Sequence, residues 1–215
     1  GVFQGPEYNR EQLFSFVESE LLAIESDLIG PNQNEYGRSD KAVAWMILAK
    51  MYLNAEVYIG QNKYTECLTY CNKIMGGGFS LASNYSHNFL ADNDFNEAGT
   101  NEIIFPLVVD SKVTQNWGAT TVIINGEVGS LESNPADFGV DNGWGGALRV
   151  REQFANRFLN GDVPLTDTRN TLSTEGREIK IVDVGDRDSG YIISKFKNVG
   201  VDGQRGGVHF EFVNT

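Results

Sequence analysis

The 215-residue chain is poor in the residues that build metal centres and covalent crosslinks, with two cysteines and two histidines. Cys67 and Cys71 are one helical turn apart in a helical pattern, where a disulfide is geometrically poor. Free thiols in such positions behave as small apolar side chains, so we expect both to be buried. His87 and His209 are far apart in sequence, which disfavours a Cys/His zinc site. We predict no metal and no cofactor.

Positive charge is also scarce, with 17 Lys and Arg against 29 Asp and Glu and a formal net charge of -12. Nucleic acid and anionic membrane surfaces would be repelled by this balance, so neither is expected as a partner. A neutral ligand such as a glycan is compatible with it. No apolar run is long enough to span a bilayer, and no signal peptide opens the chain.

The signatures of common catalytic sites are missing as well. The sequence contains no Gly-x-Ser-x-Gly elbow, no phosphate-binding loop and no dinucleotide fingerprint. The run Asp92–Asn96 has carboxylates at the first and third positions of a calcium loop. It has Glu97 where such a loop needs glycine and Ile103 where it needs glutamate, so we interpret it as an Asx-rich turn. A glycosidase pair stays an alternative, because its geometry cannot be read from sequence.

The most distinctive feature that is present is a long apolar helix, predicted from Lys41 to Tyr58 with Ser39 as its N-cap. Its apolar residues form two stripes, Ala42, Trp45, Met46, Ala49, Tyr52 and Leu53, and Ala44, Leu48, Met51, Ala55 and Tyr58. A helix that is apolar on most of its circumference must be buried on several sides. Trp45 and Tyr52 are therefore expected between helices, and Trp45→Ala is expected to cost about 3–5 kcal/mol.

A second helix, predicted from about Lys63 to Met75, follows after a short link and ends at Gly76–Gly78. Two helices joined in this way form an antiparallel hairpin. The hairpin is tetratricopeptide-like, although the chain has no 34-residue repeat. An earlier helix, from Asn9 to Ile29, is expected to pack against the hairpin, with Asn9 and Gln12 as a capping box and its acidic face in solvent.

The second half of the chain reads as strands and loops around one further helix, Ala147–Leu159. The predicted strands are Glu102–Val109, Ala119–Asn125, Glu178–Asp183, Tyr191–Lys197 and Val208–Val213. Pro106 makes the first of these an edge or bulged strand. The expected fold class is α+β, mainly helical, with a strand- and loop-rich second half. No boundary between independent domains is evident, so residues 1–215 are predicted to form a single domain.

The run from Gly37 to Leu107 resembles the most recognisable part of the SusD/RagB family, which are surface glycan-binding lipoproteins of Bacteroidetes-type bacteria. Its features are the Gly-Arg-Ser helix start, the Ala- and Tyr-rich helix, the second helix and the turn Gly78–Leu81. An Asn/Asp-rich loop then leads into Asn101–Phe105. Members of the family are longer and begin with a signal and an acylated cysteine. We therefore expect this sequence to be the middle part of an incomplete SusD-like domain.

The resemblance implies non-catalytic binding of polysaccharide or oligosaccharide on the extracellular face of the cell outer membrane. It implies delivery of the glycan to a SusC-like TonB-dependent transporter during polysaccharide utilisation and nutrient uptake. Membrane attachment would come only through a lipid anchor that this chain does not contain. A starch-like glucan is one candidate ligand, beside fructan, hemicellulose, host glycan and peptide. The alternative is a tetratricopeptide-like protein–protein interaction scaffold without glycan binding.

Two tryptophans outside the helical core are the candidate glycan-binding residues. Trp117 lies in a polar loop, and Trp144 lies among glycines that leave its ring unshielded. A sugar ring presents an apolar C–H face and a rim of hydroxyls, which an aromatic platform and short polar side chains can contact. Asn116, Asp141 and Asn142 stand beside the two tryptophans and complete the predicted site. The competing interpretation is that both tryptophans are core residues, since Trp is usually well buried.

Overall fold

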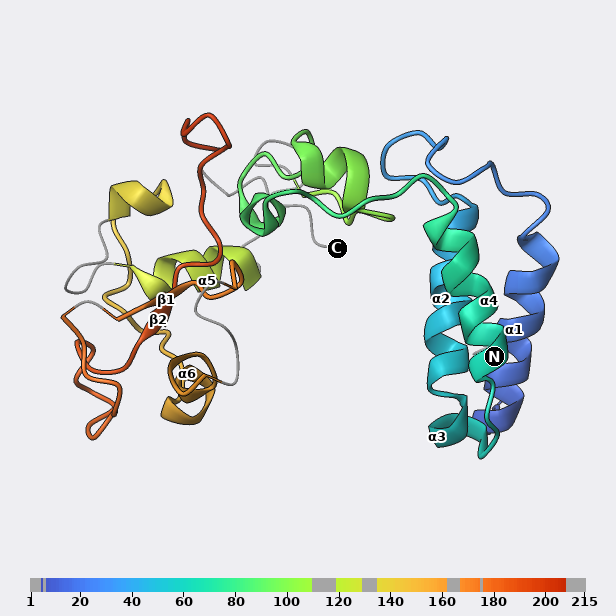
Figure 1. Cartoon of the computed structure of the whole chain (residues 1–215), viewed down its shortest axis with the longest axis horizontal. Helices are drawn as coiled ribbons and strands as arrows, with labels where there is room; N and C mark the ends of the chain where they lie inside the picture. Colours follow the sequence, from blue (N-terminus) through green and yellow to red (C-terminus); the bar gives the residue numbers. More distant parts are fainter. Residues whose placement is uncertain are drawn as a thin grey trace, which may run out of the picture. The chain divides into compact units, whose positions relative to one another are not determined.

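The computed structural model describes residues 5, 7–109, 119–128, 135–161, 167–174 and 176–207. Within these residues the chain is mostly helical with few strands (Figure 1). It divides into two compact units. The first, the helical unit, comprises the described residues up to Ser80 with Ile103–Pro106, and the second, the loop-rich unit, comprises Leu81–Glu102 and the described residues from Leu107 to Gly207. The single domain expected for residues 1–215 stays a prediction.

The helical unit contains α1 (Arg10–Ile24), α2 (Lys41–Leu53), α3 (Ala55–Ile59) and α4 (Tyr64–Met75), shown in Figure 1. The predicted capping box of α1 is confirmed, because Asn9 Oδ1 accepts from Gln12 N at 2.8 Å and Gln12 Oε1 accepts from Asn9 N at 3.0 Å. The helix ends at Ile24 instead of Ile29 and continues as a turn. No helix in the described part of the chain is long and apolar enough to cross a membrane.

The N-cap of α2 is Asp40, so the prediction of Ser39 was wrong by one residue. Asp40 is 1% exposed. Its Oδ1 accepts from Ala42 N at 2.8 Å and Val43 N at 3.2 Å, and its Oδ2 accepts from Asn32 N at 2.6 Å. A carboxylate satisfies these three amides, more than a serine hydroxyl usually does, and its charge suits the helix N-terminus.

The core of the helical unit lies between α1, α2 and α4, and α2 and α4 run antiparallel beside each other (Figure 1). Its buried members are Phe14, Leu48, Ala49, Tyr52, Ala55, Cys67 and Tyr70. Tyr52 is buried as predicted, and so is the free thiol Cys67, whereas the free Cys71 is partly exposed. Trp45 is only half-buried, because its indole Nε1 reaches out to Glu25 Oε1 at 2.8 Å.

Two expectations about the surfaces of these helices were wrong. The acidic face of α1 is not simply solvated, because Glu18 pairs with Lys63 at 3.0 Å and Glu25 pairs with Lys73 at 2.6 Å. The apolar surface of α2 is incompletely covered by the described residues, since Ile47 is 40% and Leu53 56% exposed. The helix also ends at Leu53, before α3 begins, so the predicted continuous helix to Tyr58 is two helices.

The loop-rich unit contains short helices and two very short strands. They are η1 (Tyr85–Phe89), η2 (Ala98–Glu102), α5 (Ala119–Glu127), η3 (Pro135–Phe138), α6 (Glu152–Leu159), β1 (Leu172–Ser173) and β2 (Ile192–Ile193). The strands pair antiparallel, with Leu172 opposite Ile193 and Ser173 opposite Ile192. The core of this unit is formed by Ile124, Val128, Phe138 and Val140, with Phe196 packed against it.

The segment Ala119–Asn125, predicted as a strand, is helix α5. Its β-branched residues favour a strand by propensity. Its buried positions nevertheless follow a helical spacing, with Thr120, Ile124 and Val128 four residues apart. Because Ile124 and Val128 both enter the core, burial of this stripe overrides the local preference.

Most of the other predicted strands are absent from the described residues. Glu102 ends η2, and the residues after it up to Val109 form no strand beyond a single bridge residue at Leu107, next to Pro106, which has no amide to donate to a ladder. Glu178–Asp183 forms no strand either. Tyr191–Lys197 is reduced to β2 and one isolated bridge between Lys197 and Leu90. The predicted strand Val208–Val213 lies outside the described residues.

The helix predicted from Ala147 begins only at Glu152. The preceding residues are not helical, and their amides bond elsewhere: Leu148 N donates to Gly126 O at 2.9 Å and Val150 N donates to Tyr191 O at 2.8 Å. These two amides thus donate to a carbonyl of α5 and to the carbonyl of the residue just before β2. The segment therefore ties α5, β2 and α6 together within the loop-rich unit.

Candidate functional site

The loop that carries Trp144 is anchored on the C-terminal end of α5. Trp144 N donates to Asn125 O at 2.6 Å, and Gly145 N and Gly146 N donate to Val128 O at 3.0 and 3.2 Å. The last carbonyls of a helix have no partners within the helix, and here the loop supplies some of them. The backbone of Trp144 is thus held by a rigid element, whereas its side chain is 45% exposed.

The glycines around Trp144 are required by this anchoring. Gly145 and Gly146 have left-handed φ values of 73° and 67°, which other residues adopt at a cost. A Cβ at Gly143 would lie 2.0 Å from Val128 O, so any side chain there would push the loop off α5. Arg187 Nη1 also donates to Trp144 O at 2.6 Å. Together these contacts present the indole ring to solvent on a fixed backbone.

Asp141 and Asn142 are exposed and precede Trp144 in the same loop. Arg205 Nη1 contacts Asp141 Oδ1 at 2.5 Å, and this hydrogen bond and the positive charge lower the pKa of Asp141. Asp141 is therefore an ionised acceptor whose position is constrained by Arg205. The other two predicted site residues, Asn116 and Trp117, lie outside the described residues.

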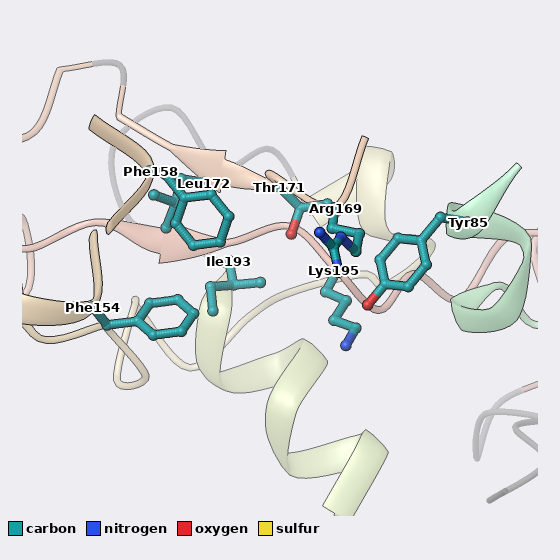
Figure 2. Close-up of a pocket in the computed structure, with 8 residues that line it drawn as sticks. All are labelled: Tyr85, Phe154, Phe158, Arg169, Thr171, Leu172, Ile193 and Lys195. Carbon is teal, nitrogen blue, oxygen red and sulfur yellow. The ribbon is translucent and has the colours of Figure 1, made fainter. Parts of the chain in front are cut away.

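The loop-rich unit also contains a recess that the sequence did not predict, here called the Tyr85 groove. It consists of three adjoining hollows of about 300, 600 and 380 Å³. The first has an apolar end formed by Phe154, Phe158, Leu172 and Ile193 and a polar end with Tyr85, Arg169 and Lys195 (Figure 2). The second is lined mainly by hydroxyl, amide and ammonium groups, contributed by Ser86, Thr168, Asn170, Thr171, Ser173, Thr174, Ser194, Lys195 and Lys197.

The pairing of β1 with β2 brings the walls of the Tyr85 groove together. Ser194 N donates to Thr171 O at 2.8 Å, directly beyond the two-residue ladder. Further along, Lys197 N donates to Phe89 O at 3.0 Å, which ties the segment that follows β2 to η1. The Lys195 ammonium lies 4.1 Å from the ring centroid of Phe89 and 5.5 Å from that of Tyr85. Residues remote in sequence thus form one recess.

Arg169 lines two of the hollows and is held by Asp167. Arg169 Nη2 lies 2.5 Å from Asp167 Oδ2, and Arg169 Nε lies 2.9 Å from Asp167 Oδ1. These hydrogen bonds lower the pKa of Asp167 to about 2, and that of Arg169 is raised. Both groups stay charged across the physiological range, and the pair is close to neutral as a unit.

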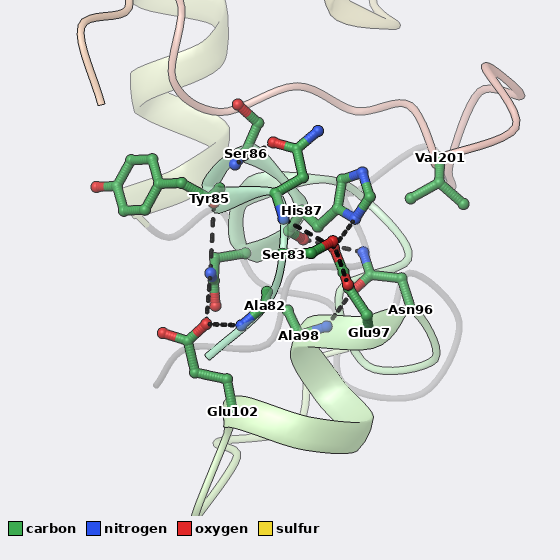
Figure 3. A network of polar contacts seen from close by, with 12 residues as sticks. Ala82, Ser83, Tyr85, Ser86, His87, Asn96, Glu97, Ala98, Glu102 and Val201 are labelled. Carbon is green, nitrogen blue, oxygen red and sulfur yellow. Dashed lines mark hydrogen bonds and ion pairs between the residues drawn. The ribbon is translucent and has the colours of Figure 1, made fainter. Parts of the chain in front are cut away.

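A polar network fixes η1, the element that carries Tyr85 (Figure 3). Glu97 Oε1 accepts from Asn84 N at 3.0 Å, and its Oε2 accepts from Ser83 Oγ at 2.8 Å. Glu102 Oε2 accepts from Ala82 N at 2.9 Å. These carboxylates bind the segment just before η1, so polar contacts help to fix the position of Tyr85.

Glu97 is expected to show the effect of this network on protonation. The Asn84 amide, the Ser83 hydroxyl and the nearby His87 lower the pKa of Glu97 to about 2. The ionised Glu97 therefore stabilises the fold fully at a pH above 4.5, the ordinary pKa of a glutamate, and this contribution is lost as the pH falls towards 2. In NMR spectra the Asn84 amide proton should titrate with a midpoint near pH 2, and a midpoint near 4.5 would show that the contact does not form in solution.

Sequence reasoning missed the Tyr85 groove because its residues come from four separate segments, around Tyr85, Phe154, Arg169 and Lys195. The alternation of Lys195 and Lys197 in a strand-like run was the available signal, since residues two apart in extended chain lie on one face. The partner segment around Thr171 carries no recognisable motif. Only the pairing of β1 with β2 places it opposite the lysines.

Comparison with known proteins identifies the fold and the family. No protein-family model matches the chain. A solved crystal structure matches with a TM-score of 0.60 over 94% of this chain and 40% of that chain, at 20% identity, so the fold is a known one. At 20% identity this match shows the fold alone.

The relative that establishes the family is the starch-binding protein SusD of Bacteroides thetaiotaomicron. This chain is 35% identical to it over 167 residues, which are 77% of this chain and 30% of SusD. On this relationship the chain belongs to the SusD/RagB family, and the predicted resemblance is confirmed. The chain thus spans less than a third of the length of the curated relative that it matches.

Proposed function

We propose that the protein binds polysaccharide or oligosaccharide without catalysing a reaction on it. The observation that carries the proposal is the exposed ring of Trp144 on a loop anchored to α5. An aromatic face of this kind stacks on the apolar C–H face of a pyranose at little entropic cost, because the backbone is already ordered. Asp141 and Asn142 supply acceptors and donors for hydroxyls at its edge. The similarity to a starch-binding protein supports the proposal.

The electrostatics around Trp144 support binding without hydrolysis. A glycosidase needs a carboxylic acid of raised pKa across a sugar cleft from a second carboxylate. Asp141 has a lowered pKa because of Arg205. Glu127 does have a raised pKa of about 8, owing to burial, but it is only 5% exposed and could not reach a glycosidic oxygen in solvent. Neither residue has the properties of a general acid.

The proposed cellular role follows from family membership. Binding would occur on the extracellular face of the outer membrane, and the glycan would be delivered to a SusC-like TonB-dependent transporter. In the helical unit, Leu53, Val57, Leu68 and Met75 are exposed apolar side chains on α2, α3 and α4. Exposed apolar surface of this kind often contacts another protein or another part of the same protein.

The same surface favours the alternative function, a tetratricopeptide-like scaffold that binds only protein. The α2–α4 hairpin would then be the active part of the molecule. A pull-down from detergent-solubilised outer membranes, with and without added oligosaccharide, separates the two functions. The scaffold retains a protein partner while no sugar binds, whereas the glycan-binding protein is retarded by a polysaccharide in affinity electrophoresis.

Replacing Trp144 by alanine tests the proposed glycan site. We expect affinity for a bound oligosaccharide to fall by about 1–2 kcal/mol, or roughly 5–30-fold, as for other aromatic contact residues. The melting temperature should hardly change, because the ring is exposed and the anchoring contacts come from the backbone. Calorimetric titration and thermal unfolding on the same protein measure both effects.

The matched control is Phe95→Ala, since Phe95 is another exposed aromatic residue of the loop-rich unit but does not belong to the Trp144 loop or line the Tyr85 groove. It should leave glycan affinity unchanged. A large fall in melting temperature for Trp144→Ala, or an equal loss of affinity in both variants, would remove Trp144 from the site.

A further inference from the structure

The Tyr85 groove is a locally basic surface on an acidic protein. The whole chain has a formal net charge of -12. The largest of the three hollows is nevertheless lined by Lys195 and Lys197 and by no carboxylate among the described residues. Two acids, Asp167 and Glu102, line only the third hollow. The first of these is paired with Arg169, and the second accepts from Ala82 N and Asn88 Nδ2, so both are already occupied.

Neither lysine of the groove has an acidic partner within the described part of the chain. The contacts of the Lys195 ammonium are ring faces, with Phe89 at 4.1 Å and Tyr85 at 5.5 Å, and the Lys197 ammonium lies 5.6 Å from the Phe138 ring. Cation–π contacts stabilise an ammonium but leave its N–H donors free to bind an acceptor. The chain has more carboxylates than cations, yet none of the described carboxylates pairs with these two lysines. Both ammonium groups can therefore donate to an external anion.

The remaining lining of the groove matches a sugar. Ser86, Thr171 and Ser194 offer hydroxyls that donate and accept, as pyranose hydroxyls require. The Tyr85 ring lines the adjoining hollow, where it offers an aromatic surface (Figure 2). A small inorganic anion would use the ammonium groups and a few hydroxyls but not the Tyr85 ring. A saccharide with an acidic group would use the ammonium groups, the hydroxyls and the ring together.

From these features we propose that the Tyr85 groove binds an acidic oligosaccharide, with its carboxylate or sulfate group between Lys195 and Lys197. The inference rests on the proposed glycan-binding function and specifies its ligand class. Lys195 and Lys197 are two residues apart in extended chain, so their side chains reach the same recess. The two ammonium groups supply charge-assisted hydrogen bonds, and flanking hydroxyls contact the sugar ring. A neutral glucan would leave both ammonium groups unused.

The test uses calorimetric titration of the whole chain with four probes of similar length. They are oligogalacturonate, its fully methyl-esterified neutral form, sulfated dextran oligosaccharide and maltooligosaccharide. We expect one of the acidic probes to bind about tenfold or more tightly than both neutral probes at low salt, with a difference that shrinks as salt is raised. Galacturonate and sulfated dextran distinguish carboxylate from sulfate as the recognised group.

Substitutions in the groove then locate the site. Lys195→Gln and Lys197→Gln should each weaken binding of the preferred acidic probe by about tenfold, since a charge-assisted hydrogen bond is lost. Lys195→Arg should retain binding, because the charge remains. The control is Lys180→Gln, which removes an exposed lysine of the same unit that does not line the groove. Thermal unfolding of each variant separates loss of the site from loss of the fold.

The outcomes separate this inference from the proposed function. If neutral oligosaccharides bind as tightly as acidic ones and Trp144→Ala weakens them all, the protein binds glycan but the acidic ligand class is wrong. If the acidic preference exists but Lys180→Gln reduces it as much as Lys195→Gln, the assignment to the Tyr85 groove is overturned. If no saccharide of either kind binds, the proposed function itself fails.

Discussion

Replacing Leu48 by alanine is expected to lower the free energy of unfolding by about 2–5 kcal/mol, the usual cost of emptying a core leucine site. Leu48 is 0% exposed and lies in the middle of α2, within the cluster that joins α2 to α1 and α4. Its side chain has no polar atom, so the loss comes from apolar transfer and the cavity left behind. Urea unfolding followed by far-ultraviolet circular dichroism measures the change.

The matched control is Leu53→Ala on the same helix. Leu53 is 56% exposed, so its removal leaves no closed cavity and should change stability by no more than about 0.5–1 kcal/mol. Equal effects at the two positions would show that the exposed face of α2 is covered in solution. Trp45→Ala is expected near or below the lower end of the range predicted from the sequence, because the indole is only half-buried.

Replacing Glu127 by glutamine is expected to stabilise the protein at alkaline pH and to flatten its pH dependence. Glu127 is 5% exposed at the end of α5, and one carboxylate oxygen, Oε2, has no hydrogen-bond partner among the described residues. Burial raises the pKa of Glu127 from the ordinary value of 4.5 to about 8. The folded protein therefore holds a proton that the unfolded chain releases, and glutamine removes this difference because it is neutral at every pH.

The sign of the pH dependence follows from linkage. Between pH 4.5 and 8 the folded state binds more protons at Glu127 than the unfolded state, so stability falls as the pH rises. Over this interval the free energy of unfolding falls by on the order of 5 kcal/mol in total, because each pH unit contributes about 1.4 kcal/mol. Asp141, Asp167 and Glu97 have lowered pKa values and act in the opposite direction, but only in more acidic solution.

Urea unfolding of the native protein and of Glu127→Gln at pH 5, 6.5 and 8 measures this difference. The two proteins should be similar at pH 5 and diverge by a few kcal/mol at pH 8. Glu178→Gln is the control, since Glu178 is an exposed glutamate of the same unit and should follow the native protein. A native protein whose stability is level or rises over this range would contradict the buried, protonated state of Glu127.

Features that depend on short sequence spacing were predictable. The Asn9–Gln12 capping box, the antiparallel packing of α2 with α4 and the burial of Tyr52 follow from residues three or four apart. A helix hairpin with a short link has few alternative arrangements, so local pattern and final structure agree. Trp144 was predictable as an exposed residue for a similar reason, because its neighbouring glycines cannot cover the ring.

The strands were the least predictable part. In Ala119–Asn125, β-branched residues indicated a strand, but the buried stripe of Ile124 and Val128 makes it a helix. Whether such a segment is helical depends on which surface it can bury, and that surface is supplied by Phe138 and Val140 from elsewhere in the chain. Propensity differences are around 1 kcal/mol or less per residue, which burial of a single core side chain can exceed.

The sequence by itself determined the helical first part, the family and one exposed aromatic residue, because these depend on local periodicity and on a contiguous run of residues. Only the tertiary structure decided that the glycines beside Trp144 fit against the last carbonyls of α5. It alone decided that Lys195 and Lys197 face Thr171 and η1 across a groove. The pairing that closes this groove involves two residues per strand, which is too little backbone for any sequence pattern to specify.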